Sequence, residues 1–296
     1  MKHTVTCIEH TRCEGSTLAT LVVEYPRFIH SEVMTHRSLA KNASSSRAIP
    51  MRRMIEMVGY SPVIPVRFGQ NKSGMQDTGQ PVRDEHTAKQ LWLHAAMAAV
   101  TTAESFENLQ VHKQVTNRIL EPFAPIKVVI TGNTGLANYG WDWFIQQRRH
   151  PDAQPEIQVL ATQIAEAIED MPVWDDQYHL PFVTPEERDI YSANDNLLDL
   201  IRVSGARCGR VSYFTMEPMS FEQEITFSND KMLSKGHWSP FDHQAVAADL
   251  DAIHSALESD LRAWMTSMVT GIGSIPRDID CRHLRGWVPG RVYLGG

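Results

Sequence analysis

Anion-binding side chains are concentrated between Met34 and Pro50, in the stretch MTHRSLAKNASSSRAIP. The guanidinium of Arg47 can donate two parallel hydrogen bonds to a phosphate, and Ser44–Ser46 add hydroxyls and closely spaced backbone N–H groups. These residue types predict a cradle for the phosphate of a small ligand. A simpler interpretation stays open, in which the stretch is a polar loop whose serines satisfy their own turns.

Two further polar clusters could contribute to such a site. The run Gln146–His150 (QQRRH) places two adjacent arginines at an expected helix entrance, and the run His237–His243 (HWSPFDH) offers Ser239 as a helix cap. Each has an ordinary alternative, a solvated face for the arginines and a plain helix start for the serine. Paired carboxylates, a Cys–His pair and a G-x-S-x-G motif are missing, so no cluster alone predicts a reaction.

Composition limits the class of protein. The chain has 296 residues, of which 42% are hydrophobic, and a net charge of -7. This is enough for one large domain, or two small ones, with a buried core. Because the acidic chain has no long Lys/Arg run, we expect no binding to nucleic acid or to a membrane surface. The start MKHTVTCIEH lacks the apolar core of a signal peptide, and no apolar run approaches a membrane span, so we expect a soluble cytoplasmic protein.

Cysteine usage predicts neither a disulfide framework nor a metal centre. Cys7, Cys13, Cys208 and Cys281 are few for a chain of this length, so we expect reduced thiols. The spacing of Cys7, His10 and Cys13 could supply three zinc ligands. A fourth ligand is not evident nearby, and we therefore predict no metal site.

The hydrophobic pattern indicates the elements that position these clusters. Thr17–Tyr25 and Ile126–Thr131 are β-branched and apolar, which predicts two strands. A short helix is expected over Met51–Gly59, followed by a long loop over residues 60–85, which are rich in Gly, Pro, Gln and Asp. The stretch His86–Leu120 has no Gly or Pro and predicts a long core helix that allows one break. Its apolar positions at helical spacing include Leu91, Ala95, Val100 and Phe106.

Later helices have clearer starts. Pro155 suits the first turn of a helix whose apolar face includes Ile157, Leu160, Ile164 and Ile168. Thr184–Glu187 has the pattern of a capping box, and Ser239–Asp242 is similar. The turn GNTGLANYG lacks the G-x-G-x-x-G spacing, so we expect no Rossmann site. The pattern predicts a helix-rich chain with a few strands. It shows neither repeats nor a linker that would divide the chain into two domains.

Taken together, the polar clusters resemble the flavin-dependent thymidylate synthases. The signature of that family is R-H-R, two residues, S, one residue, N-E, one residue, S, one residue, R. Here Thr35–His36–Arg37 is followed by Asn42, Ser45 and Arg47 at matching spacing. Three positions depart from the signature, namely Thr35 in place of the first Arg, Ala40 in place of the first Ser and Ala43 in place of the Glu.

Four more segments carry the resemblance. Arg118–Pro122 (RILEP) is similar to the family's arginine-to-proline segment, and RRHPDAQPEIQ is similar to its R-x-x-x-H-A-Q-W-E-I segment, with Asp152 for the His and Pro155 for the Trp. Ala206–Tyr213 (ARCGRVSY) resembles A-R-V-S, and GHWSPFDH resembles H-G-T-P-F-E-H. In the usual order the last two precede the His-Arg signature, whereas here they follow it. The chain thus resembles a circular permutation, which folds tolerate when their termini lie close together.

The resemblance implies a fold and an assembly. It implies a single α/β domain over residues 1–296 with the thymidylate synthase-complementing protein-like fold, helix-rich with a small sheet and circularly permuted. It also implies a homotetramer in which FAD and a nucleotide bind where subunits meet.

Site residues follow from the resemblance position by position. The phosphate of dUMP is expected to contact Ser45, Ser46 and Arg47, joined by Arg118 of a neighbouring subunit. Glu32 stands where the family commonly has a nucleotide-contacting Gln, and Arg148 matches the arginine that polarises the pyrimidine ring. The positions implied for the cofactors are Thr35, His36, Arg37, Ser212 and Ser239 for FAD, and His237 near the folate and nicotinamide.

The implied reaction is the reductive methylation of dUMP to dTMP. NADPH reduces FAD, and methylenetetrahydrofolate passes its one-carbon unit through the flavin, while the protein orients the ring and stabilises its charge. Two alternatives stay open. Thr35 and Ala43 allow a change of substrate to dCMP or of product to a hydroxymethyl group. Loss of the signature Arg and Glu also allows a non-catalytic flavin or nucleotide sensor, against which the retained Arg148 argues mildly.

Overall fold

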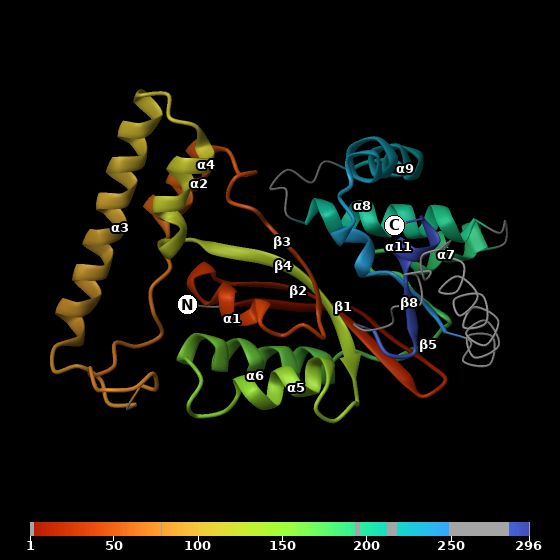
Figure 1. Ribbon diagram of the computed structural model, residues 1–296, viewed down its shortest axis with the longest axis horizontal. Coiled ribbons are helices and arrows are strands. Elements are labelled where there is room, and N and C mark those ends of the chain that lie inside the picture. Colours follow the sequence, from red (N-terminus) through yellow and green to blue (C-terminus); the bar gives the residue numbers. More distant parts are fainter. Residues whose placement is uncertain (1–2, 78, 193–195, 212–217, 249–283, 296) are drawn as a thin grey trace, which may run out of the picture.

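The computed structural model describes residues 3–77, 79–192, 196–211, 218–248 and 284–295 (Figure 1). Within them the main sheet has five strands in the order β3-β4-β2-β1-β5. Neighbours are antiparallel except for the parallel pair β1 and β5. The strands are β1 (Thr4–Cys13), β2 (Ser16–Pro26), β3 (Ala40–Ala43), β4 (Pro125–Thr134) and β5 (Trp174–Asp175). The mixed α/β prediction is confirmed.

The centre of the sheet follows the hydrophobic pattern, and one edge of it was not predicted. The strands expected over Thr17–Tyr25 and Ile126–Thr131 are confirmed as β2 and β4. Strand β1 was missed because its sequence TVTCIEHTRC is half polar. It pairs with β2 through a two-residue turn in which Glu14 and Gly15 both have positive φ, 47° and 78°. Such turns favour a hairpin, so Glu14-Gly15 was the available signal.

Each face of the sheet packs against different helices. Leu21 and Val23 of β2 and Val128 of β4 belong to a core that contacts α5 (Gly140–Arg148) and α6 (Pro155–Glu169), which lie along one face in Figure 1. On the opposite face Val129 packs against α8 (Leu197–Arg210). Because neighbouring side chains of a strand point to opposite faces, a sheet buried on both sides reads as a continuous apolar run.

The remaining helices form an end group and a C-terminal group. The expected helices at Met51 and Pro155 are confirmed, the latter burying Ile157, Leu160 and Ile164. The end group contains α1 (His30–Met34), α2 (Met51–Tyr60), α3 (Glu85–Asn108) and α4 (Lys113–Leu120) with the 3-10 turns η1 (Arg27–Ile29) and η2 (Glu121–Phe123). The C-terminal group contains α7 (Pro185–Ser192), α9 (Phe221–Phe227), the π-helical η3 (Ser228–Met232), the 3-10 turns η4 (Leu233–Lys235) and η5 (Ser239–Asp242), and α11 (Gly290–Tyr293).

The expected core helix over His86–Leu120 is confirmed with the one break that the prediction allowed, but its buried face differs from the expected one. It is divided into α3 and α4, because the side chain of His112 accepts a hydrogen bond from the backbone of Gln114 and starts a new helix. Its buried face is narrower than expected. Leu91 is 63% exposed, whereas α3 buries Ala96 and Ala103 against the other helices of the end group.

Capping motifs in the second half of the chain had mixed outcomes. The Thr184 box is confirmed, since Thr184 Oγ1 accepts from the backbone of Glu187 and the Glu187 carboxylate accepts from the backbone of Thr184. The similar pattern at Ser239 was wrong. Ser239–Asp242 is a 3-10 turn without a side-chain cap, because Ser239 Oγ donates to Asn42 instead. Nearby, a small antiparallel sheet contains β6 (Tyr178–His179), β7 (Ala245–Ala247) and β8 (Trp287–Pro289).

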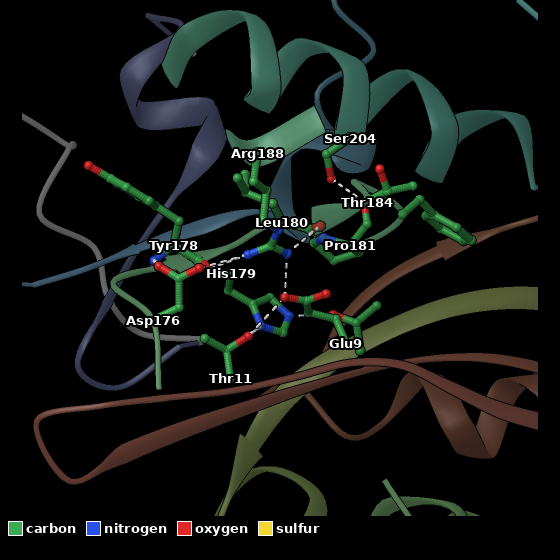
Figure 2. Close-up of polar contacts among 12 residues, drawn as sticks. Glu9, Thr11, Asp176, Tyr178, His179, Leu180, Pro181, Thr184, Arg188 and Ser204 are labelled. Carbon is green, nitrogen blue, oxygen red and sulfur yellow. Dashed lines mark hydrogen bonds and ion pairs between the residues drawn. The ribbon is translucent and has the colours of Figure 1, made fainter. Parts of the chain in front are cut away.

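A buried polar cluster fastens the second half of the chain to β1 (Figure 2). Arg188 of α7 donates to Glu9 Oε1 at 2.6 Å, to Asp176 Oδ2 at 2.9 Å and to the backbone carbonyl oxygens of Tyr178 and Leu180. Further along, Thr11 donates to the same Glu9 oxygen. The members of this Arg188 cluster are Glu9, Thr11, Asp176, His179 and Arg188. Because Arg188 is on α7 and Glu9 is on β1, the cluster joins these two elements.

Candidate functional site

Four residues expected at the site meet beside a cavity. Arg148 Nε donates to His36 Nε2 at 2.8 Å, and Arg148 Nη2 donates to Thr35 Oγ1 at 3.1 Å. Arg148 Nη1 lies 3.4 Å from Glu32 Oε2. We call Glu32, Thr35, His36 and Arg148 the Arg148 cluster. More than a hundred residues separate its two parts in sequence, so the fold itself assembles it.

Helix α5 places Arg148 at its C-terminal end. Gly140 opens the helix with φ of 54°, and a Cβ there would lie 2.3 Å from the Asn133 carbonyl oxygen, so only glycine fits. Trp141 anchors the helix by donating its indole N–H to the Ala19 carbonyl oxygen at 2.9 Å. The expectation that Arg148 stands at a helix entrance was therefore wrong. A cation at the C-terminal end of a helix is favoured by the helix dipole.

His36 is neutral in this cluster. Burial first, and then the charges of Arg148 and Lys41, lower its pKa to about 4. Because Arg148 donates into Nε2, the single ring proton of His36 is on Nδ1. The ring also packs edge-on against Phe144, with the centroids 4.8 Å apart. The guanidinium of Arg148 is thus held in place by an uncharged partner that does not neutralise it.

Lys41 supports His36 from the other side and was missed by sequence reasoning. Its ammonium donates to the backbone carbonyl oxygens of His36 and Leu39, the latter at 2.9 Å. Burial lowers its pKa to about 8. A lysine at a variable position of the signature gave no signal in the sequence. The contacts hold the loop that carries His36 against the end of β3.

The cavity beside the Arg148 cluster measures about 450 Å³. This volume is within the range of small-molecule sites, about 300–1,000 Å³. Its lining combines guanidinium groups, amides and aromatic rings, from Thr35, His36, Arg37, Ser38, Asn138, Tyr139, Trp143, Gln147 and Arg148. Such a donor set suits a planar ring that carries negative charge. Tyr139, Trp143 and Gln147 were not predicted as site residues, although the aromatic run NYGWDWF after a strand was a usable signal.

The expected phosphate loop lies outside this cavity. Ser45 and Arg47 are exposed, whereas Ser46 is buried. Asn117 of α4 holds the loop by donating to the carbonyl oxygens of Ser46 and Ile49 at 2.8 and 3.0 Å. The four residues of β3, about 13 Å at 3.3 Å per residue, separate the loop from the Arg148 cluster. Within one chain the predicted residues therefore form two separate groups, the Arg148 cluster and the phosphate loop.

Two residues of the expected phosphate-binding set, Ser44 and Arg118, hydrogen-bond to other parts of the chain. Ser44 Oγ accepts from the backbone of Lys127 at 3.2 Å, which supports the structural interpretation for this one serine. Arg118 is exposed on α4, adjacent to Asn117, and donates to Glu121 at 2.9 Å. Helix α4 and the loop thus face the same side of the end group. Arg118 is near the loop of its own chain.

The two displaced segments lie against the signature. Asn42, which the signature retains, accepts a hydrogen bond from Ser239 Oγ at 3.2 Å and donates to the Cys208 carbonyl oxygen at 3.3 Å. The segments also contact each other, because Ala206 and Phe241 belong to the same buried cluster. Segments that follow the signature in sequence thus return to it in space, as a permuted chain requires. The permutation itself stays a prediction.

Three expected cofactor residues are not placed at the cavity. Ser239 is in η5 and does not line it. His237 is exposed beside η4 and its backbone N–H bonds to the Met232 carbonyl oxygen. Ser212 lies outside the described residues. None of these roles is tested by the geometry.

The Cys7–His10–Cys13 spacing is used for folding in β1. Both ring nitrogens of His10 are hydrogen-bonded, Nδ1 to the Met171 carbonyl oxygen at 3.2 Å and Nε2 to Thr134 Oγ1 at 3.3 Å. Burial raises the pKa of the Cys7 thiol to about 12. Across the described ranges, no group of three or more His, Cys, Asp or Glu side chains could hold a metal ion. Those ranges also contain no helix that is long and apolar enough to cross a membrane.

Comparison with known proteins adds a family match. The family described as "Thy1: Thymidylate synthase complementing protein" matches residues 4–173, a range that includes the Arg148 cluster and the phosphate loop and ends before both displaced segments. No curated protein matches the chain. Among solved structures, the UMP/dUMP methylase PolB from Streptomyces cacaoi bound with 5-Br UMP is similar, with a TM-score of 0.46 and 16% identity over 65% of this chain and 94% of that chain. A structure of the same enzyme bound with 5-Br dUMP is similar with a TM-score of 0.40 and 15% identity, over 60% of this chain and 71% of that chain.

Proposed function

Because the chain belongs to the thymidylate synthase complementing protein family, we propose that it is a flavin-dependent methylase of pyrimidine nucleotides, and that it converts dUMP to dTMP. The observation that carries this proposal is the Arg148 cluster. A permanently charged guanidinium is held by His36 and Thr35 at the wall of a cavity that fits a small ring. The family match supplies the reaction class, and the cluster supplies a group able to perform its electrostatic part.

The donor set fits a flavin and a nucleotide. Both ligands combine a flat heteroaromatic ring with phosphate groups, and the cavity combines aromatic walls with cationic Arg37 and Arg148. We propose that Thr35, His36 and Arg37 hold FAD, with Ser239 nearby in η5, where its hydroxyl donates to Asn42 of the signature. When bound, FAD would accept a hydride from NADPH and transfer the one-carbon unit of methylenetetrahydrofolate.

The protein's own contribution is charge stabilisation. Carbon 5 of the uracil ring can attack a one-carbon unit because the ring has enolate character, which puts negative charge on its oxygen atoms before the new C–C bond forms. Arg148 would donate to such an oxygen. Its geometry is set in advance by Glu32, Thr35 and His36, so little reorganisation accompanies the charge. Glu32 cannot donate to a phosphate, and we propose that it positions Arg148 instead of binding the nucleotide.

Phosphate binding would use the second group of residues. Ser45 and Arg47 are exposed, and Arg118 lies on the adjacent helix α4, so their donors can face a ligand or another subunit. Because β3 separates this group from the Arg148 cluster, we propose that a complete site combines the cavity of one subunit with the phosphate loop of another. A homotetramer would provide that arrangement. His237, exposed beside η4, is proposed to face the folate and nicotinamide.

The experiment begins with the visible absorption spectrum of the purified protein, as isolated and after reconstitution with FAD. We expect a bound flavin that bleaches on anaerobic addition of NADPH, faster when dUMP is present. Formation of dTMP is then measured with methylenetetrahydrofolate, with dCMP and UMP assayed in parallel. A protein that cannot hold FAD would contradict the proposal. Turnover of dCMP alone would replace the substrate, and tight dUMP binding without any product would favour a sensor.

A further inference from the structure

Helix α5 presents an outward face that the mechanism above does not use. Trp141 and Phe144 point into the core, whereas Trp143 is half-buried and Gln147 is exposed. Residues four apart in a helix lie on the same face, so Trp143 and Gln147 are neighbours. Both line the cavity that Arg148 borders at the end of the same helix. The face therefore adds a flat apolar surface and a primary amide to the ligand site.

The two aromatic rings in the cavity differ in their availability. The guanidinium of Arg285 covers the ring of Tyr139, with its central carbon 3.9 Å from the ring centroid. Trp143 has neither a ring contact nor a side-chain hydrogen bond with any residue in the described part of the chain. The aromatic rings of most other tryptophans are packed, as Trp141 is against Phe144 at 5.9 Å. Trp143 is thus the ring that can accept a stacked partner.

We propose that Trp143 is the stacking surface for the uracil ring of the nucleotide, and that Gln147 bonds to the edge of that ring. The identity of the ring rests on the proposed function. Uracil presents a carbonyl beside an N–H, and a primary amide has one acceptor and two donors that match this pair. Aromatic stacking tolerates any base, and the amide can turn to present its groups in either order. The α5 face therefore admits uracil and cytosine alike, and discrimination between them comes from elsewhere.

Equilibrium binding to the full-length protein tests this assignment. Calorimetric titration with dUMP is carried out on the wild type and on Trp143→Phe, Trp143→Ala and Gln147→Leu. Loss of the stacked ring in Trp143→Ala is expected to weaken dUMP binding at least about 5-fold, which is the lower end of the range for base–aromatic stacking. Trp143→Phe keeps a ring and should stay within about 3-fold of wild type. Trp174→Ala, on the half-exposed strand β5, is the matched control and should leave dUMP binding unchanged.

The outcomes separate this inference from the proposed function. If Trp143→Ala binds dUMP as tightly as the wild type, the stacking assignment is overturned while the methylase proposal stands. If Trp143→Ala loses FAD binding but keeps dUMP, the ring on Trp143 is the flavin and the assignment is also overturned. A wild type that binds no pyrimidine nucleotide overturns both. Weakened dUMP binding with unchanged FAD binding and circular dichroism supports the assignment.

Discussion

The Arg148 cluster and the Arg188 cluster share four residue types, the second adding the aspartate Asp176, and have different properties. Each contains an arginine, a glutamate, a histidine and a threonine. In the Arg188 cluster the guanidinium lies 2.6 Å from Glu9, and a second carboxylate and two backbone carbonyl oxygens accept its other hydrogen bonds. In the Arg148 cluster the distance to Glu32 is 3.4 Å, and the guanidinium borders a cavity. Residue types alone therefore do not distinguish a ligand site from a structural clamp.

What separates the two clusters is how completely carboxylates offset the charge of the arginine. The Glu9 side chain is 7% exposed, against 33% for Glu32. Glu9 and Asp176 lie 2.6 and 2.9 Å from the Arg188 guanidinium and outweigh its charge, so the smaller cavity of about 250 Å³ beside it does not suit an anion. The cluster joins α7 to β1. Arg148 is held by a neutral histidine and a hydroxyl, so its positive charge is only partly offset by Glu32. With Arg37 also lining the cavity, the open site has an excess of positive charge, which attracts a negatively charged ligand.

Removing the arginine of the closed cluster should have the largest effect on folding. Arg188→Ala leaves Glu9 buried without its partner, and breaking a buried ion pair typically costs about 3–5 kcal/mol of the free energy of unfolding. Urea denaturation of both proteins measures the difference. Because the variant could fail to fold, Arg188→Ala combined with Glu9→Leu is included, and we expect it to recover part of the loss. Equal stability of Arg188→Ala and the wild type would show that the cluster is not a clamp.

Removing the arginine of the open cluster should act on turnover instead. Arg148→Ala is expected to lower kcat for dTMP formation about 10²–10³-fold, as loss of one charge-stabilising donor does elsewhere, with a smaller change in KM. The free energy of unfolding should change by less than about 1 kcal/mol, because Arg148 and Glu32 form a long, partly exposed pair. Arg149→Ala, at the exposed neighbouring position, is the control. Normal turnover in Arg148→Ala would refute the proposed electrostatic role.

The sequence predicted the centre of the fold well, for a physical reason. Strand β2 and helix α6 bury continuous or periodic apolar residues, and those patterns are local. Helix α3 was harder, because its fully buried positions are the small residues Ala96 and Ala103, while Trp92 and Val100 are only partly buried. Periodicity identifies a helix, but it cannot show that Leu91 has no partner within the described part of the chain. Burial depends on neighbours that are distant in sequence.

The candidate site shows the same division. The signature identified Thr35, His36 and Arg37 because their spacing is local, and it identified Arg148 as a separate motif. That Arg148 donates to His36, and that it ends a helix, could not be predicted, since both depend on how α5 crosses the sheet. The Arg188 cluster was not predicted at all. Its members come from three separated stretches without a motif, and only the fold shows that they meet.

The smallest expected effect concerns His36 and His179. We infer that both are neutral, because each is buried and each lies near the arginine of its own cluster. Thr11 donates its only proton to Glu9, so it accepts from His179 Nδ1–H, and His179 Nε2 then accepts from Thr20. Burial lowers the pKa of His179 well below its usual value, and burial together with Arg148 lowers that of His36 to about 4. Nitrogen-15 NMR should therefore show both rings as Nδ1–H tautomers at pH 6.

These lowered pKa values determine how stability depends on pH. A histidine whose pKa is lower in the folded state binds protons preferentially when unfolded, so its contribution is complete above about 6.5 and is lost as pH falls toward the folded pKa. The loss is about 1.4 kcal/mol per pH unit for each such histidine. Between pH 6.5 and 5 the free energy of unfolding of the wild type should decline as pH falls. His179→Gln and His36→Gln should each reduce the slope of that decline by this amount. Glu9, whose pKa is raised by burial, acts in the opposite sense, so the difference from wild type is the quantity measured.

Arg148→Ala removes one cause of the lowered pKa of His36 and should raise that pKa while leaving the pKa of His179 unchanged. A shift of both histidines would mean that the clusters are coupled through the sheet and are not independent.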